Sequence, residues 1–162
     1  MSPTKSIAPL LLSGLLLACG SSDPKTLIGE GNKALGSSDF KTAQSKFTEA
    51  LKELKPGDAA YIEAKLGLVQ ALIQAEPKKA TAEFLALATQ CPGQVGEKDF
   101  DFIGGQMVSA HKYLDAIDLV DAGIKRAGGE SPKLKLQMSR IKKEAASDKA
   151  VSDKLAGLGY TN

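Results

Sequence analysis

Small and apolar residues recur at helical spacing along most of the chain. Leu27, Gly31 and Leu35 are four residues apart, which places them on one face of a helix. A Ser-Ser-Asp segment follows, and these residues favour turns and helix N-caps. A second helix is predicted from about Lys41 to Lys55, and Pro56 with the glycine after it ends this helix. The two helices are expected to form an antiparallel hairpin.

The same layout returns twice further along the chain. Ala43, Ala80 and Ala116 occupy equivalent positions and are separated by 37 and 36 residues. A period in this range is typical of solenoids built from helical hairpins, and not of propeller blades or leucine-rich strands. The pattern therefore predicts an all-α fold. The helices expected in the second and third units span 59–75, 80–90, 100–110 and 114–126.

A fourth segment, residues 131–162, departs from this scheme. Pro132 begins a helix whose apolar face contains Leu134, Met138 and Ile141, while several lysines lie on its polar sides. This helix is expected to cap the array and keep it soluble. Residues 147–154 either continue the capping helix or begin another short one.

Several residue types recur at matching positions of the units. The first unit contains Gly31-Asn32, Ser38-Asp39-Phe40, Ala43, Phe47, Ala50-Leu51 and Pro56. The third contains Gly104, Tyr113, Ala116-Ile117 and Gly123, with Val120 at the position where the first unit has the aromatic Phe47. In the second unit, Pro77 replaces an aromatic residue at the turn.

These units resemble tetratricopeptide repeats over about residues 25–130, divided into units at about 25–57, 59–93 and 97–129. The resemblance implies a right-handed superhelical solenoid of about three helical hairpins with a C-terminal capping helix. It also implies a role in holding peptides or proteins, and it implies no reaction.

In this family the first helix of each hairpin lines a concave groove that binds the partner. The matching positions here are Ile28, Asn32, Leu35, Lys65, Val69, Leu72, Asp101, Gly105 and Val108. The alternative for the apolar members is that they pack against the neighbouring hairpin or the capping helix. A clamp for a C-terminal carboxylate is not expected, because Ile28 and Phe102 stand where basic residues would be needed.

The N-terminus has the features of an export signal. Lys5 precedes an apolar run from Ile7 to Ala18 that is too short to span a bilayer but suits the core of a signal peptide at residues 1–18. The end of this run, Leu16-Leu17-Ala18-Cys19, resembles the lipobox of bacterial lipoproteins. This resemblance implies cleavage before Cys19, a lipid on Cys19 that binds the membrane, and a flexible tether at residues 19–24. Gly20 after the cysteine favours the outer membrane. The alternatives are an ordinary signal peptide and an uncut anchor.

The charges of the chain are balanced overall but segregated along it. Without Lys5 the chain has 20 basic and 19 acidic residues, which gives no reason to expect nucleic acid as a partner. Residues 97–121 contain six acids and two lysines, whereas residues 133–154 contain seven bases and three acids. Either the capping helix lies against the third unit and the two charges attract, or the basic helix contacts anionic lipid or an acidic partner.

The sequence contains little that would support catalysis. His111 is the only histidine, and it lies in an expected turn. No set of metal-ligand residues, phosphate-binding loop or nucleophile motif is present, so no catalytic residue, metal or cofactor is predicted. Cys91 is interpreted as a small buried residue, and the alternative is an intermolecular disulfide or a reactive thiol.

The sequence therefore predicts an exported, lipid-anchored adaptor of the cell envelope that binds a protein or peptide. An accessory or regulatory subunit of an envelope enzyme complex and a secreted, unanchored binding module are the competing hypotheses. Self-association through an exposed end of a short array also stays open.

Overall fold

The computed structural model describes residues 23–160, and this part of the chain consists of α-helices without a β-strand. The predicted signal peptide, Cys19 and most of the expected tether lie outside the described residues. The helices are α1 (Pro24–Gly36), α2 (Phe40–Ala50), α3 (Ala59–Leu72), α4 (Pro77–Gln90), α5 (Glu97–Ser109), α6 (Tyr113–Arg126), α7 (Pro132–Glu144) and α8 (Lys149–Gly157). The predicted all-α class is confirmed.

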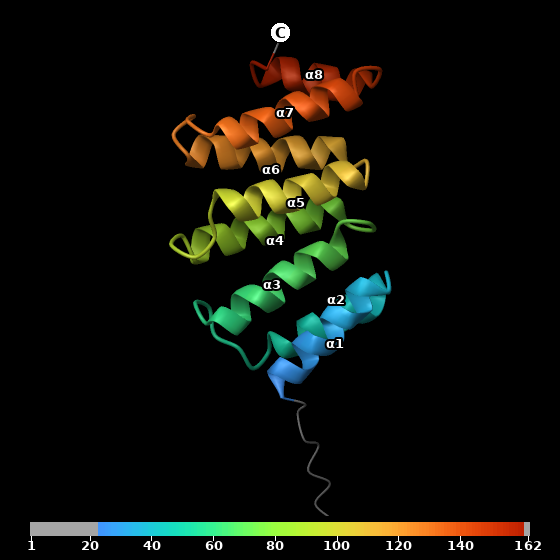
Figure 1. Ribbon diagram of the computed structural model, residues 1–162, viewed down its shortest axis with the longest axis vertical. Coiled ribbons are helices and arrows are strands. Elements are labelled where there is room, and N and C mark those ends of the chain that lie inside the picture. The colour runs from blue at the N-terminus through green and yellow to red at the C-terminus, as the bar shows by residue number, and fades with distance from the viewer. Residues whose placement is uncertain (1–22, 161–162) are drawn as a thin grey trace, which may run out of the picture.

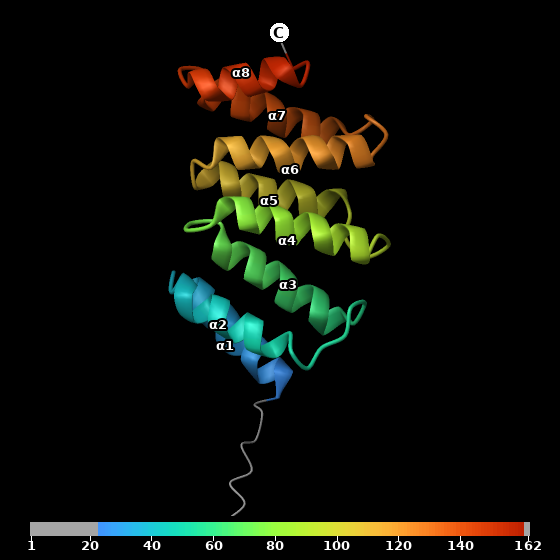
Figure 2. The same ribbon diagram turned by 180° about the vertical axis from the view of Figure 1, so that it is seen from behind.

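The helices are stacked along the long axis of the molecule, with α1 and α2 at one end and α7 and α8 at the other (Figures 1 and 2). Most helices pack against the next helix in the chain, and α1 also packs against α3, α5 against α7, and α4 against α6. A contact that is weaker than these joins α3 to α5. The core therefore runs along the stack between its odd-numbered and even-numbered helices.

Several helices begin or end at residues other than those the apolar pattern predicts, because local hydrogen bonds and prolines decide their ends. The helix predicted from Lys41 to Lys55 ends at Ala50, where the chain turns through bonds such as that from the Glu53 N–H to the Ala50 carbonyl (3.2 Å). The helix α4 begins at Pro77 instead of Ala80, because proline suits the first turn of a helix.

The second half of the chain shows the same effect. The helix α5 begins at Glu97 instead of Phe100, where the Gly96 N–H donates to the Asp99 carboxylate (2.8 Å). Residues 147–154 do not extend the capping helix. They form the start of the separate helix α8, whose first N–H groups donate to the side chain of Asp148, with a distance of 2.9 Å from Ala150 N.

A fully buried phenylalanine holds the first three helices together. Phe47 on α2 lies against Gly31 on α1 and Gly67 on α3, and a Cβ atom added to these glycines would lie only 2.7 Å and 2.3 Å from its ring. Glycine is therefore required at both positions for the helices to approach this closely. Cys91, at the end of α4, is buried as the sequence predicts, and only 4% of its surface is exposed.

Candidate functional site

A hollow of about 560 Å³ crosses the odd-numbered helices and is the clearest candidate for a binding site. It lies at the C-terminal ends of α1 and α3 and extends along α5 to one residue of α7. The residues that line it are Leu35, Phe40, Gln70, Ile73, Gln74, Asp101, Phe102, Gly105, Gln106, Ser109, Ala110 and Arg140. We call this hollow the groove.

Three of the residues that the sequence assigned to a binding surface line the groove. They are Leu35 on α1 and Asp101 and Gly105 on α5. The polar candidates Asn32 and Lys65 lie outside its lining. The Asn32 amide donates to Glu63 (3.1 Å), and the Lys65 ammonium forms an ion pair with Glu83 (2.7 Å), so both side chains join neighbouring helices.

Four other apolar candidates lie in the core. Ile28, Val69, Leu72 and Val108 expose only 4%, 0%, 1% and 1% of their surfaces, and none of them lines the groove. This burial agrees with the alternative in which they pack against neighbouring helices. The physical reason is the rotation of about 100° between successive residues of a helix, which separates the buried Val69 from Gln70, the residue of α3 that lines the groove.

Sequence reasoning missed the glutamines of the groove. Gln70 on α3 and Gln106 on α5 are half-buried, and the Gln106 Nε2 donates to the Gln70 Oε1 across the two helices (3.1 Å). Gln74 lies just beyond the end of α3 and is exposed. A glutamine on a helix surface is ordinary, so no sequence signal distinguished these three residues from other solvated side chains.

Among the aromatic residues that line the groove, Phe102 is the most exposed. Its side chain has an exposed fraction of 52%, and it lies one residue after Asp101 on α5. Large apolar side chains at this level of exposure are frequent in binding surfaces. The sequence contained a signal for it, because Phe102 does not match the buried face of α5 formed by Phe100, Ile103 and Met107.

The two charged residues of the groove are paired with neighbours. Asp101 forms an ion pair with Lys133 on α7 (2.7 Å), and the hydrogen bond and charge of Asp101 raise the pKa of Lys133. Arg140 pairs with Glu144 along the same helix (2.6 Å). One carboxylate and one guanidinium line the groove, so its formal charge is zero.

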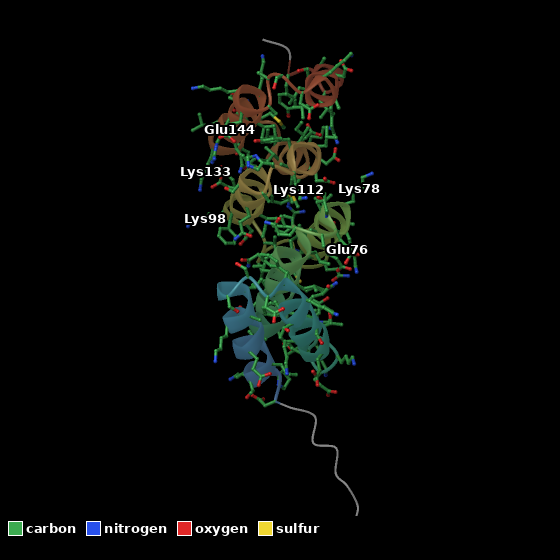
Figure 3. The ribbon with its side chains drawn as sticks, turned by 90° about the vertical axis from the view of Figure 1, so that its right-hand side faces the viewer. Glu76, Lys78, Lys98, Lys112, Lys133 and Glu144 are labelled. Atoms are coloured by element: carbon green, nitrogen blue, oxygen red, sulfur yellow. The ribbon has the colours of Figure 1, made fainter. Side chains whose placement is uncertain are left out.

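The segregated charges of the sequence meet where α7 and α8 pack on α5 and α6. Besides the Asp101–Lys133 pair, Lys154 pairs with Asp118 (2.7 Å) and the Ser131 hydroxyl donates to Glu97 (2.9 Å). The expected attraction between the capping segment and the third unit is therefore present. Figure 3 shows Lys98 and Lys133 on one side of the molecule, opposite Lys78 and Glu76.

Catalytic groups do not converge in the described part of the chain. His111 is exposed in the turn between α5 and α6, where its Nδ1 lies 2.8 Å from the Tyr113 hydroxyl. Across residues 23–160, no three His, Cys, Asp or Glu side chains come together as a metal site would require. Among the helices described, none is both long and apolar enough to span a bilayer.

Comparison with known proteins does not identify a relative: no protein family model matches the chain, and neither a curated protein nor a solved structure matches it significantly. The function of the groove must therefore be inferred from its own shape and chemistry. Its lining combines carboxamide and apolar side chains with one carboxylate and one guanidinium, the mixed character that is typical of ligand sites.

Proposed function

We propose that this protein is a lipid-anchored adaptor of the bacterial cell envelope, which binds a protein or peptide partner through the groove of a tetratricopeptide-like solenoid. The groove carries the proposal, because it offers exposed apolar and amide side chains from several helices on one surface. Such a surface can hold a segment of another polypeptide without any catalytic group.

The regular spacing of the helices supports the solenoid. The even-numbered helices begin at residues 40, 77, 113 and 149, so their starts are separated by 37, 36 and 36 residues. The segment that follows the third unit is also a pair of helices, because a second short helix, α8, follows the capping helix α7. The proposal is therefore a solenoid of four helical hairpins, in which the last hairpin acts as the cap.

The position of α1 supports a role for the anchor. Only three residues lie between Cys19 and Asp23, the N-cap of α1, so the chain takes four residue steps from one to the other. At about 3.4 Å per residue, a lipid on Cys19 holds the first helix within about 14 Å of the membrane. The basic helix α7 lies at the opposite end of the stack (Figure 1), so this geometry does not favour its contact with lipid beside the anchor.

Crosslinking in native membranes followed by affinity capture through a C-terminal tag tests the proposal. The wild-type chain is compared with Cys19→Ser, with Phe102→Asp in the groove, and with Leu136→Asp as a matched control. Leu136 is 72% exposed on α7 and does not line the groove. We expect Cys19→Ser to lose membrane association and Phe102→Asp to lose the crosslinked partner, while Leu136→Asp retains both.

Two results would contradict the proposal. Unchanged membrane association of Cys19→Ser would exclude the lipid anchor. Equal capture by wild type and Phe102→Asp would exclude the groove as the binding surface. Recovery of one stoichiometric enzyme would instead favour the competing role as a regulatory subunit, because an assembly adaptor is expected to capture structural components of the envelope.

A further inference from the structure

The groove contains side chains that can bind a peptide main chain. A glutamine carboxamide presents N–H donors next to a carbonyl acceptor, so one side chain can donate to and accept from the same extended peptide unit. The Gln106 amide uses one N–H toward Gln70, and the Gln70 amide donates to the Leu66 carbonyl (3.3 Å). Gln106 and the exposed Gln74 both line the groove, and neither the Gln106 carbonyl oxygen nor the Gln74 amide has a hydrogen bond within the described residues that would occupy it.

The electrostatics of the groove disfavour a charged ligand. Asp101 and Arg140 are already neutralised by Lys133 and Glu144, so a charged ligand would have to compete with ion pairs of 2.7 Å and 2.6 Å. The C-terminal ends of α1 and α3 also lie at the groove, and the carbonyl end of a helix repels a carboxylate.

The shape of the groove provides space beside an aromatic ring. Phe102 and Gly105 are three residues apart on α5, so they are neighbours on the helix surface. Gly105 contributes no side chain to this wall of the groove, and a Cβ atom added there would lie 3.3 Å from the Gln137 Nε2 on α7. Leu35 on α1 and Phe40 on α2 complete the apolar lining on the other side. One apolar side chain of a ligand could be covered between these walls.

From these three features we infer that the groove binds an uncharged, extended peptide segment. Its main chain bonds to the carboxamides of Gln74 and Gln106, and one apolar side chain of the segment lies against Phe102. This inference rests on the proposed use of the groove for binding, and it specifies the chemistry of the partner: a segment without a free carboxylate or charged side chains.

Calorimetric titration of the lipidated full chain in lipid nanodiscs, with empty nanodiscs as the blank, tests the inference. The probe is a blocked nine-residue peptide of threonine and glutamine with one central phenylalanine. Four companion peptides each change one feature of this probe. They have, in turn, a free C-terminal carboxylate, two glutamates, two lysines, and alanine in place of the phenylalanine. We expect the neutral peptide to bind, and each companion to bind at least about tenfold more weakly, the effect of losing roughly one good interaction.

Protein variants locate the peptide on the groove. Gln74→Glu and Gln106→Glu keep the shape of the side chain but replace the N–H donors with a negative charge, so each should weaken binding of the neutral peptide about tenfold or more. Gln90→Glu is the matched control, because Gln90 lies at the end of α4, outside the groove lining, and its oxygen accepts from the Tyr61 hydroxyl. Phe102→Ala should abolish the preference for phenylalanine over alanine in the peptide, and Leu136→Ala should not.

Several outcomes would overturn the inference. The first is tighter binding of a charged peptide, or of the peptide with a free carboxylate, than of the neutral peptide. The second is an equal effect of Gln106→Glu and Gln90→Glu on binding. The third is self-association of the chain that Phe102→Ala abolishes, because a second copy would then be the occupant of the groove. Circular dichroism of every variant separates loss of binding from loss of folding. The neutral peptide could fail to bind while Phe102→Asp still loses the crosslinked partner in native membranes. This pair of results would reject the partner chemistry inferred here but leave the adaptor proposal intact.

Discussion

The two junctions on either side of α3 are built from the same residue type but differ in what it meets. Between α1, α2 and α3, the ring of Phe47 lies against Gly31 and Gly67. Between α4 and α5, the ring of Phe84 meets Phe100 edge-on, with ring centres 4.8 Å apart. A glycine lets the next helix approach the ring, whereas a second ring keeps it at a distance.

This difference explains where the groove lies. The helix α3 packs closely on both α1 and α2, but α5 makes only limited contact with α3, and the glutamines Gln70 and Gln106 join these two helices. The residues that face the groove come mainly from the helices on the two sides of this looser junction. In this stack a glycine on α3 accompanies the close junction with α1 and α2, whereas a pair of glutamines joins α3 to α5 at the looser junction.

Breaking the close junction around Phe47 should have the largest effect on the free energy of unfolding. Gly67→Ala places a Cβ atom about where the Phe47 ring already is, and we expect it to lower the free energy of unfolding by about 3 kcal/mol, the upper range for an overpacked core. Urea denaturation followed by circular dichroism measures this change. Phe47→Leu in the same chain should restore part of the loss, because it frees the space that the new Cβ needs.

A matched glycine provides the control for this test. Gly29 lies on the exposed face of α1, and a Cβ atom added there would have no neighbour within 4 Å. Gly29→Ala should therefore raise the free energy of unfolding by about 0.5–1 kcal/mol through helix propensity alone. Equal losses for Gly29→Ala and Gly67→Ala would show that close packing on Phe47 is not the reason for glycine at position 67.

Weakening the junction between α4 and α5 should have a smaller effect on the free energy of unfolding. Phe100→Leu removes the aromatic pair with Phe84 but keeps an apolar side chain, so we expect a loss of about 1.5 kcal/mol in the free energy of unfolding. Phe102→Leu, two residues along the same helix, should change it by less than about 0.5 kcal/mol because this side chain is half exposed. The same urea titrations measure both. A larger loss of unfolding free energy for Phe102→Leu than for Phe100→Leu would contradict the assignment of Phe100 as the packed ring and Phe102 as the exposed ring.

The junction between α5 and α7 contains a buried acceptor that can be removed. The Gln137 Nε2 donates to the Asp101 carbonyl (3.1 Å), but within the described residues its buried Oε1 has no hydrogen-bond partner. Gln137→Met keeps the approximate size and removes the unpaired acceptor, so we expect a gain of about 1 kcal/mol in the free energy of unfolding. A loss of similar size would mean that the Nε2 bond outweighs the unpaired oxygen.

The C-terminal end of the stack should show the smallest effect and a dependence on pH. The Tyr160 hydroxyl donates to the buried Asp121 carboxylate (2.9 Å). Tyr160→Phe should therefore lower the free energy of unfolding by about 0.5–1 kcal/mol near neutral pH. Burial, the bond to Asp121 and its negative charge raise the pKa of Tyr160 from 10.0 to about 12.

The sign of this dependence follows from the raised pKa. The folded chain retains the tyrosine proton more strongly than the unfolded chain, so the stabilisation is complete below about pH 10 and is lost as pH rises toward about 12. We expect the difference between wild type and Tyr160→Phe to shrink over this interval, measured by urea denaturation at successive pH values. A difference that stays constant up to pH 12 would exclude ionisation of Tyr160 as its source.

The helices were more predictable than the groove. Apolar spacing and turn residues located the first six helices, but several ends differed because capping bonds, such as that from the Gly96 N–H to Asp99, decide where a helix begins. The separate helix α8 depended on a similar bond to Asp148. Of the proposed groove residues, Leu35 and Asp101 line the hollow, while Val69 is in the core.

The sequence by itself determined that the chain forms repeated amphipathic helices with close approaches at its glycines, because apolar periodicity and glycine spacing are local properties. It also contains the apolar run before Cys19 from which the lipid anchor is proposed. Only the tertiary structure decided which helix faces stay open. Each helix in a stack has neighbours on more than one side, so its apolar stripe is covered from several directions, and the angle between helices decides whether Gln70 or Val69 faces the groove.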